Sequence, residues 1–418
     1  MDQRRIKLEV AIYGAVAFAA LLASYSAFRP VRDALVLDGD LDQIPWLFLA
    51  TFVAVSVVSP MWSALLTKHS RPRAVPVAFH VFVACEIGFF LAVRAQIAPV
   101  SVGHVFYVWS AVFNLFVVSV FWSLLADLLG PGAARQLYGP IAAGGTIGTF
   151  VGPLLTRTLV GTIGAAGVLL MSALLLELAV ICVYGVQRAA VGLDRGTGPA
   201  RDDEPQKSAG GALTGIAYVA KSPYLSAIAG YVLCTSCAAT FLYLQQLGIV
   251  KAAIPARAAR TEFLASIELW TSGVALILQT LIARPALGKL GPGIVLVVLP
   301  LVQLAGISVF ATSPSLAVIA VVLVIGRAST HGLTRPAREL LFTVVSRDEK
   351  YRAKNAIDTI AYRFGDVGSS WLYTGLLATS GGSSVLVGAT ILLVATWIRF
   401  AFRAGAGFRQ RVTKELPP

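Results

Sequence analysis

Long, almost unbroken runs of apolar residues follow one another along the whole chain, separated by short polar breaks. Most runs are about 20 residues long, which is the length an α-helix needs to cross the hydrocarbon core of a bilayer. The strands of a membrane barrel would instead alternate apolar and polar residues over about ten positions. Helices also satisfy their own backbone hydrogen bonds, as lipid requires. The pattern therefore predicts an all-α membrane protein.

The positions of these runs predict twelve transmembrane helices in two sets of six. A hydrophilic stretch rich in Gly, Asp, Arg and Pro separates the sets, a composition typical of a flexible linker. We therefore expect an N-terminal six-helix bundle over residues 1–187, a cytoplasmic linker over 188–212 and a C-terminal six-helix bundle over 213–418. The expected spans are residues 10–36, 45–66, 75–93, 102–128, 137–159, 165–186, 224–250, 263–283, 294–311, 316–345, 353–377 and 385–402.

The two halves carry matching features, which indicates an internal repeat. The junctions after the second and eighth expected helices, residues 66–73 and 287–292, are both short and basic and are followed by an apolar restart. An offset of about 217 residues also aligns Gly148 with Gly365. Repeat symmetry of this kind is typical of transporters that work by alternating access. Two six-helix bundles joined by a cytoplasmic loop resemble the major facilitator architecture.

Composition and charge support the assignment to a membrane. Of the 418 residues, 57% are apolar and 13% are charged, and the mean hydropathy is +0.77, whereas a water-soluble protein of this length needs far more polar surface. The net charge of +13 would indicate a nucleic-acid partner in a soluble protein, but here the basic residues orient the chain. Placing both termini in the cytoplasm, with the chain in the cell inner membrane, leaves 25 of the 34 basic residues on the cytoplasmic side.

The chain offers little to catalysis or metal binding. All four cysteines lie within apolar runs, and the C-x-x-C pair of Cys234 and Cys237 has no second pair and no neighbouring histidine, so we interpret them as packing residues. A nucleophile–base set, a metal-ligand cluster and a phosphate-binding glycine loop are all absent from the sequence. We therefore predict no enzyme activity, no metal, no cofactor and no nucleic-acid partner. We expect a monomer, as is usual for facilitator-type transporters.

An ionisable residue inside the membrane is costly there and marks a candidate functional site. Arg29 and Arg32 lie three apart in the first expected helix and share one face. Two guanidiniums on one face suit a phosphate or a carboxylate, which each can grip through two hydrogen bonds. Pro30 removes a backbone hydrogen bond and can open the helix toward a cavity. The alternative is that both arginines extend to the outer interface, with Asp33 as a partner.

Two further arginines lie near the bilayer midplane in the second half. Arg327 has no acidic residue in its own helix, so it either pairs with another helix or contacts an anion in the transport pathway. Arg363 and Asp366 lie three apart on one helix. They form either an internal ion pair or a contact that changes partners during the transport cycle.

Five acidic residues are candidates for coupling transport to an ion gradient. A carboxylate in low-dielectric surroundings can exchange a proton near neutral pH, and the alternative for each is a pair with an arginine of another helix. Asn114 lies among the aromatic residues of the fourth expected helix, a face that would either stack on a flat ligand or pack in the core. The five acidic residues are Asp33, Glu86, Glu177, Glu268 and Asp366.

Four segments carry a resemblance to a known family: residues 28–34 (FRPVRDA), 105–109 (VFYVW), 121–127 (FWSLLAD) and 135–139 (RQLYG). Here the chain resembles the nucleotide (ATP/ADP) transporters of plastids and intracellular bacteria, and their free-living bacterial relatives. The resemblance implies a facilitator-type fold, nucleotide counter-exchange or proton symport, and a phosphate-binding role for Arg29 and Arg32. Those exchangers typically have a lysine at the second of these positions and longer loops, so the resemblance speaks more strongly for the fold than for the nucleotide.

We therefore predict a secondary active transporter of an organic anion, with a nucleotide as the candidate substrate. One alternative is a proton-driven exporter of a metabolite or drug, with the arginines held in structural pairs, and another is a membrane partner or sensor that transports nothing. Arginines that converge on one cavity without acidic neighbours would favour the anion transporter. Arginines about 3 Å from a carboxylate would favour the alternatives. The predicted substrate-binding residues are Arg29, Arg32, Asn114, Arg327 and Arg363.

Overall fold

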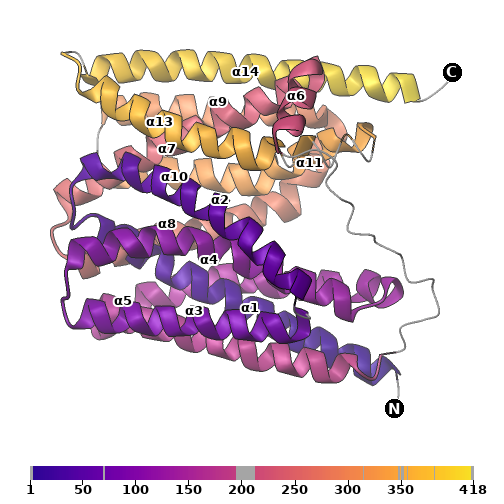
Figure 1. Cartoon of the computed structure of the whole chain (residues 1–418). Coiled ribbons are helices and arrows are strands. Elements are labelled where there is room, and N and C mark those ends of the chain that lie inside the picture. Colours follow the sequence, from indigo (N-terminus) through magenta and orange to yellow (C-terminus); the bar gives the residue numbers. More distant parts are fainter. Residues whose placement is uncertain are drawn as a thin grey trace. The chain divides into compact units, whose positions relative to one another are not determined.

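The computed structural model describes residues 3–68, 71–193, 212–313, 315–346, 349, 353–354, 356–380 and 382–415. Within these ranges every regular element is a helix, which confirms the all-α prediction (Figure 1). The chain forms two compact units: unit 1 comprises Met1–Asp203 with Ile254–Leu269, and unit 2 comprises Glu204–Ala253 with Trp270–Pro418. Most of the expected linker, residues 194–211, lies outside the described residues.

Unit 1 is built on long helices from the first half of the sequence. The longest, α5, is divided by Gly164, whose backbone angles (φ 69°, ψ 175°) are not helical. A positive φ of this size costs glycine nothing, and it falls between two of the expected spans, 137–159 and 165–186. The helices are α1 (Gln3–Val36), η1 (Leu41–Gln43), α2 (Ile44–Lys68), α3 (Arg71–Arg94), α4 (Pro99–Leu128), α5 (Pro131–Ala190) and the first part of α8 (Arg257–Ile277).

Unit 2 contains more interruptions. Gly291 has φ 74° and divides α9 in the same way that Gly164 divides α5. Three segments, η2, η3 and η5, are π-helical, a form that is often found at functional sites. The elements are α6 (Ala212–Lys221), α7 (Pro223–Ala253), η2 (Leu278–Ala283), α9 (Arg284–Thr312), α10 (Leu316–Ser329), η3 (Thr330–Thr334), α11 (Arg335–Leu341), η4 (Phe342–Val344), η5 (Ala356–Ala361), α13 (Tyr362–Leu377) and α14 (Gly382–Glu415).

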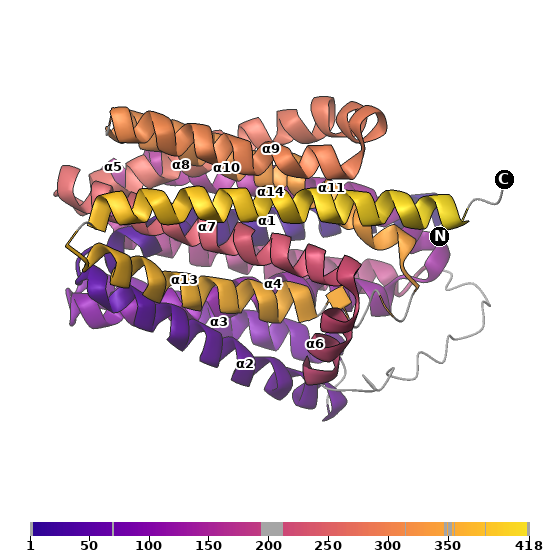
Figure 2. The same cartoon turned by 90° about the horizontal axis from the view of Figure 1, so that it is seen from above.

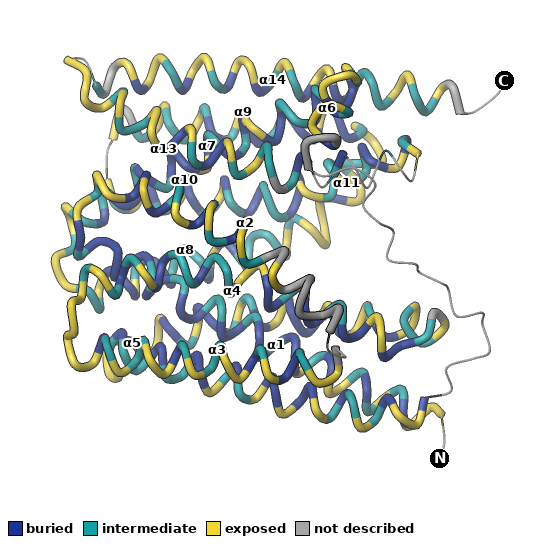
Figure 3. The backbone as a smooth tube through the Cα atoms, in the orientation of Figure 1, coloured by how far each residue is buried: buried dark blue, intermediate teal, exposed yellow. Residues whose placement is uncertain are grey.

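The described part of the chain contains nine helices that are long and apolar enough to cross a membrane. Two of them, residues 132–190 and 257–310, are long enough for two crossings and contain the left-handed glycines Gly164 and Gly291. Many large apolar side chains on these helices are exposed. Figure 3 marks the exposed residues in yellow, and they recur along individual helices. Apolar surface of this extent is stable against lipid and not against water.

Glycines set the close approach of α1 and α5 in unit 1. A Cβ atom at Gly144 would lie 2.2 Å from the carbonyl oxygen of Ala15, and one at Gly148 would lie 2.1 Å from that of Ala19. Neither distance leaves room for a side chain, so α1 lies directly against the backbone of α5. Small residues allow this approach in membrane helices, where packing rather than water exclusion holds helices together.

Large side chains hold the centre of unit 2, where α7 packs against both α13 and α14 (Figure 2). Tyr231 of α7 and Trp397 of α14 are buried, with ring centroids 5.7 Å apart. The Tyr231 hydroxyl donates to the carbonyl of Leu296 at 2.9 Å, which satisfies its polar end inside the core. The amphipathic helix α6 begins at the last residue of the expected linker and precedes α7, in a segment before the expected span 224–250 for which no helix was predicted.

Candidate functional site

Arg29 is held by a carboxylate that comes from a distant part of the sequence. It extends from α1, and its Nη1 atom donates a hydrogen bond to Oε2 of Glu268 at 3.0 Å. Glu268 belongs to α8, in the segment of that helix that is part of unit 1. The Arg29 side chain is 30% exposed and that of Glu268 is 14% exposed, so the pair is partly open. Such a pair is strong enough to hold two side chains and weak enough to be replaced by a better anion.

Arg32 pairs with the residue next to it. Its Nε and Nη2 atoms donate to Oδ1 of Asp33 at 2.8 and 2.6 Å, and its guanidinium lies 4.9 Å from the ring centre of Tyr107. Only 11% of the Arg32 side chain is exposed. Helix α1 runs on through Pro30 to Val36, so the expectation that Pro30 opens the helix is wrong. Of the two arginines, Arg29 is the more accessible.

A second ion cluster in unit 1 joins the end of α1 to the start of α8. Asp38 accepts a contact of 2.6 Å from Arg257 and a hydrogen bond of 3.3 Å from Arg260. The Nε atom of Arg260 also donates to the carbonyl of Ile254 at 2.6 Å. In the sequence Arg257 and Arg260 served only as charges that indicate orientation, because nothing in their spacing relates them to Asp38.

Glu86 of α3 is fully buried among hydroxyl groups. Its Oε2 atom accepts from Ser172 of α5 at 3.0 Å, and Oε1 lies 3.4 Å from the hydroxyl of Ser24 of α1. The two serine hydroxyls are 2.9 Å apart, and Ser172 also lies 3.1 Å from the carbonyl of Ser24. Within the described residues no cation comes within ion-pair distance of Glu86. Buried polar groups are tolerated when they are hydrogen-bonded in this way.

Glu177 and Asn114 lie at less enclosed positions. Glu177 contacts His80 at 3.3 Å, and 38% of the glutamate side chain remains exposed. Asn114 is exposed, whereas Phe113 beside it is buried. The ring of Phe113 lies edge to face against that of Phe28, with centroids 5.2 Å apart, so this aromatic face of α4 packs in the core. Of the two roles considered for this face, the geometry supports packing.

In unit 2, Arg327 contacts a buried amide. Its Nη2 atom donates to Oε1 of Gln246 at 2.7 Å, and Gln246 is almost fully buried in α7. An amide oxygen satisfies one guanidinium hydrogen bond without neutralising the charge. Arg327 is the last basic residue of α10 and stands just before the π-helix η3, so the local backbone departs from regular α geometry beside it.

Asp366 of α13 is buried against two hydroxyls of α7. Its Oδ1 atom lies 2.5 Å from the hydroxyl of Ser236 and 3.2 Å from that of Thr240. The Ser236 hydroxyl is also 2.7 Å from the carbonyl of Tyr362. Arg363, one turn earlier on the same stretch of helix, is half-buried and close enough to Asp366 to interact with it electrostatically.

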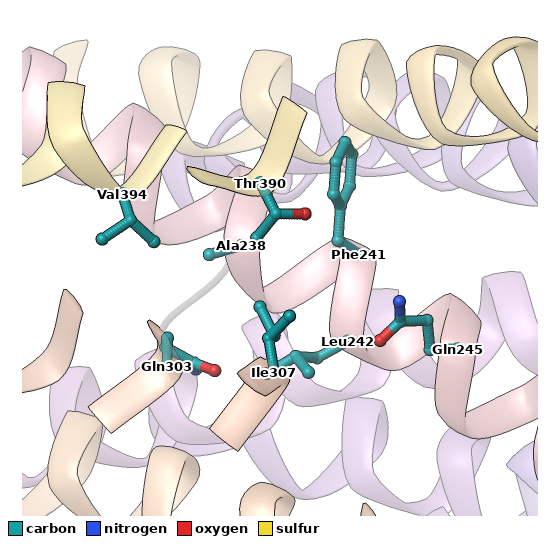
Figure 4. A pocket seen from close by; sticks show the side chains of 8 residues that line it. All are labelled: Ala238, Phe241, Leu242, Gln245, Gln303, Ile307, Thr390 and Val394. Atoms are coloured by element: carbon teal, nitrogen blue, oxygen red, sulfur yellow. The ribbon is translucent and has the colours of Figure 1, made fainter. Parts of the chain in front are cut away.

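A small cavity lies between α7, α9 and α14 in unit 2 (Figure 4). Its volume is about 10 Å³, which is room for a single water molecule and not for an organic substrate. Gln303 lines it, and among the described residues its carbonyl oxygen has no hydrogen-bond partner. Thr390 and Gln245 supply the other polar groups.

The predicted site residues thus fall into separate sets. Arg29 and Arg32 belong to unit 1 and each has a carboxylate partner, whereas Arg327 and Arg363 belong to unit 2. The structure brings Arg29 together with Glu268, and it leaves Glu86 in a cluster of its own. The serines and threonines around Glu86 and Asp366 escaped the sequence reasoning, because hydroxyl residues in an apolar helix carry no signal of their partner.

Comparison with known proteins places the chain among carriers. A sequence model of the family described as TLC ATP/ADP transporter matches residues 100–408. The ADP,ATP carrier protein 1 of Chlamydia muridarum is 22% identical over 455 aligned residues, covering 92% of this chain and 85% of the carrier. The protein of the same name from Chlamydia trachomatis is also 22% identical and is covered to 86%.

Solved structures share the fold at low sequence identity. The nucleoside transporter NupG matches with a TM-score of 0.63 and 13% identity, over 99% of both chains. A bacterial homologue of the iron transporter ferroportin, in its inward-facing state, matches with a TM-score of 0.65 and 14% identity, over 96% of this chain and all of the other. Likenesses at this identity establish a transporter fold and carry no information about the substrate.

Proposed function

The chain belongs to the TLC ATP/ADP transporter family, and we propose that it carries a nucleotide of the ATP/ADP type across the inner membrane by alternating access. It is a multi-pass membrane transporter and not an enzyme. The nucleotide is proposed from the family and from the chlamydial carriers, whose names specify ADP and ATP. Exchange of one nucleotide for another and symport with a proton are both compatible with this proposal.

The match of the TLC ATP/ADP transporter family to residues 100–408 carries the proposal. The partly open pair of Arg29 and Glu268, which by itself favours the alternatives, is proposed as the place where the substrate phosphate enters. A nucleotide phosphate carries more negative charge than a carboxylate and presents several oxygens to a guanidinium, so it can take the place of Glu268. Glu268 comes from a different segment of the chain, and in this scheme it moves away from Arg29 when the phosphate binds. Asp33, which holds Arg32 against Tyr107, serves in this scheme to position the neighbouring guanidinium.

Arg327 and Arg363 are proposed as the contribution of unit 2 to substrate binding. Arg327 donates to the amide oxygen of Gln246, a group that carries no charge of its own. Asn114 is exposed and can offer an amide to the substrate. These assignments rest on the charge or exposure of each side chain and on its position within an expected span, where a polar group is costly.

Glu86 and Asp366 are the proposed coupling carboxylates. The Ser236 hydroxyl has one hydrogen but two acceptors within reach, the carbonyl of Tyr362 and the carboxyl of Asp366. A proton on Asp366 supplies the missing hydrogen, so that Asp366 donates to Ser236. Around Glu86 hydroxyl hydrogens are also too few, because the two serine hydroxyls have two hydrogens and take part in four contacts. A proton on Glu86 would supply another. Glu177 and Glu268 remain candidates only after they leave His80 and Arg29.

We also propose the architecture that the sequence predicts: twelve spans in two six-helix bundles, with both termini in the cytoplasm and the protein acting as a monomer. Gly164 and Gly291 support the span count, since each divides a helix that is long enough for two crossings. The segment formed by η5 and α13 supplies a further apolar stretch. The boundaries proposed for the bundles are residues 1–187 and 213–418, joined by the linker over 188–212.

Transport assays in proteoliposomes test the function directly. Vesicles loaded with unlabelled ADP should take up labelled ATP faster than empty vesicles if the protein exchanges nucleotides. Empty vesicles with an inward proton gradient should take up ATP if it is a symporter. Arg29→Gln should strongly reduce either activity. If wild-type protein moves no nucleotide under any of these conditions, the nucleotide proposal is wrong.

A second candidate function is proton-driven export of a less charged metabolite or drug. It is favoured by the carboxylate partners of Arg29 and Arg32, which leave little net charge at that end of α1. The same vesicles distinguish it. Under a proton gradient the protein should then transport compounds from an amphiphilic panel, whereas nucleotides should neither be transported nor inhibit that transport.

A further inference from the structure

Unit 2 contains an open groove that none of the proposed roles uses. Its volume is about 470 Å³, which falls within the range of small-molecule sites. One wall comes from η2 and the beginning of α9, and the other from α11. The residues that matter for its chemistry are Gln279, Ala283, Arg284, Leu287, Pro336 and Leu340.

The π-helical form of η2 shapes one wall of the groove. A π-helix bonds each residue to the fifth along, which widens the turn, so that residues four and five apart can line one face. Gln279, Ala283 and Arg284 all line the groove for this reason. In a regular α-helix a residue five positions on would turn away from Gln279. The amide of Gln279 and the guanidinium of Arg284 therefore line the same groove because the backbone departs from α geometry here.

Arg284 is the cationic group that remains available at this site. Among the described residues of the same region, Arg338 lies 3.3 Å from Asp358, and Lys354 lies 2.6 Å from Glu339. Arg284 is exposed, and no carboxylate of the described chain lies within ion-pair distance of it. Arg338 and Lys354 are thus paired with acids, whereas Arg284, which lines the groove, has no carboxylate partner among the described residues.

The rest of the lining is apolar. Ala283, Leu287, Pro336 and Leu340 offer hydrocarbon and no hydrogen-bonding side chain. The guanidinium of Arg284 and the amide of Gln279 therefore lie beside an apolar surface. This combination suits a ligand that has an anionic group at one end and an apolar group next to it. A guanidinium holds two oxygens of a phosphate through parallel hydrogen bonds, and an amide nitrogen can donate to a third.

We propose that this groove binds a phosphate group, with Arg284 and Gln279 as its ligands and the remainder of the same molecule packed against Leu287 and Leu340. The phosphate has two possible sources. Basic pockets between membrane helices hold the headgroups of anionic phospholipids. A nucleotide on its way to the transport site has the same chemistry, and only this second source rests on the proposed function.

Binding also has a route by which to affect transport. The second π-helix, η3, packs directly on the first, since a Cβ atom at Gly332 would lie 2.6 Å from Cβ of Leu278. Arg327 stands just before η3 in the chain. An occupant that stabilises η2 therefore acts on the helix that carries a proposed substrate residue.

The test uses full-length protein and two ligands. Native mass spectrometry counts phosphatidylglycerol adducts on detergent-purified protein, with a phosphate-free galactolipid as the reference. Equilibrium dialysis measures binding of ATP against adenosine. Arg284→Gln and Gln279→Ala are compared with Arg403→Gln, which removes an equally exposed arginine of α14 outside the groove. The Arg284 change should weaken phosphate binding about tenfold, and the Arg403 control should not.

Each outcome bears on the proposal. Loss of phosphatidylglycerol adducts alone identifies a lipid headgroup, loss of ATP binding alone identifies the nucleotide, and loss of both shows a groove that accepts either. If Arg284→Gln changes neither ligand more than Arg403→Gln does, the groove is not a phosphate site. A wild-type protein that binds the lipid through Arg284 but transports no nucleotide would overturn the proposed function and leave this inference standing.

Discussion

Two helix contacts occupy corresponding places in the two units, but one is lined by small apolar residues and the other by polar side chains. In unit 1 α1 lies against α5, and in unit 2 α7 lies against α13. The repeat offset of 217 residues relates the contact of Gly148 with Ala19 to that of Gly365 with Ser236. The internal repeat indicated by the sequence is therefore visible as a repeated packing arrangement.

The difference lies in what surrounds the paired glycines. In unit 1 the α1 positions are alanines, and the contact is backbone against backbone. In unit 2 the corresponding α7 positions are Ser236 and Thr240, and both face Asp366. By the same offset, Asp366 corresponds to Thr149 of α5, which is half-buried and whose hydroxyl donates to the carbonyl of Thr146 in its own helix. A contact without polar side chains is rigid, whereas one built around a carboxyl group can change with protonation.

The largest expected effect is on assembly of the apolar contact. Gly148→Ala should destabilise the protein by about 3 kcal/mol or more, because its Cβ atom would lie 2.1 Å from a carbonyl oxygen that cannot move alone. Gly365→Ala should cost about half as much, because its Cβ atom meets the side chain of Ser236 at 2.8 Å. Thermal unfolding of the two variants in detergent measures the difference, and equal losses would show that the two contacts are equally rigid.

The next effect separates the arginines of the two units. Arg29→Gln should lower kcat/KM for nucleotide exchange about 100-fold, which corresponds to the loss of a charge-assisted phosphate contact of about 2.7 kcal/mol. Glu268→Gln should lower KM instead, because it removes the group that competes with the phosphate. Initial rates in proteoliposomes at varied ATP concentration distinguish these changes.

Arg327→Gln supplies the matched variant in unit 2. An effect as large as that of Arg29→Gln would mean that both units grip the phosphates equally. If Glu268→Gln raises KM, Glu268 contributes to binding rather than opposing it, and the proposed exchange of partners at Arg29 fails.

A smaller effect is expected from the polar contact of unit 2. Asp366→Asn should reduce uptake driven by a proton gradient about tenfold, because an amide cannot release a proton to the other side of the membrane. Thr149→Val, at the corresponding position of unit 1, should leave that uptake unchanged. The measurement is initial uptake at fixed ATP with and without the gradient, and an equal loss in both conditions would place Asp366 in folding or binding rather than in coupling.

The smallest effect concerns a contact on α6 that has no described counterpart in unit 1. The Tyr218 hydroxyl donates to Glu349 at 2.6 Å and holds the pKa of that carboxyl below its usual range. A carboxyl whose pKa is lowered on folding adds stability at neutral pH and loses it as the pH falls through the folded-state pKa. Tyr218→Phe should therefore cost about 1 kcal/mol at pH 7 and progressively less on acidification. Unfolding measured between neutral and acidic pH checks this, and a loss that does not vary with pH would contradict it.

Much of the fold could be predicted because it depends on local properties. The apolar runs marked the long helices, and the breaks between residues 159 and 165 and between 283 and 294 contain the glycines that the structure places in left-handed conformation. Arg29 could be predicted as a candidate from its place inside the first expected helix, its spacing from Arg32 and the family likeness of residues 28–34. The partners could not be predicted, because Glu268 lies 239 residues away from Arg29 and nothing in either neighbourhood indicates the other.

The amino-acid pattern alone predicts a helical membrane protein, indicates that its two halves are related and places charges within its helices. These properties follow from transfer free energy and backbone hydrogen bonding, which act on each segment separately. The partners of these charges follow from the way the chain folds. Arg29 contacts the carboxylate of Glu268, Arg327 contacts the amide of Gln246, and Asp366 lies among hydroxyl groups. Those outcomes depend on which helix faces meet, and that is set by packing between segments far apart in the chain.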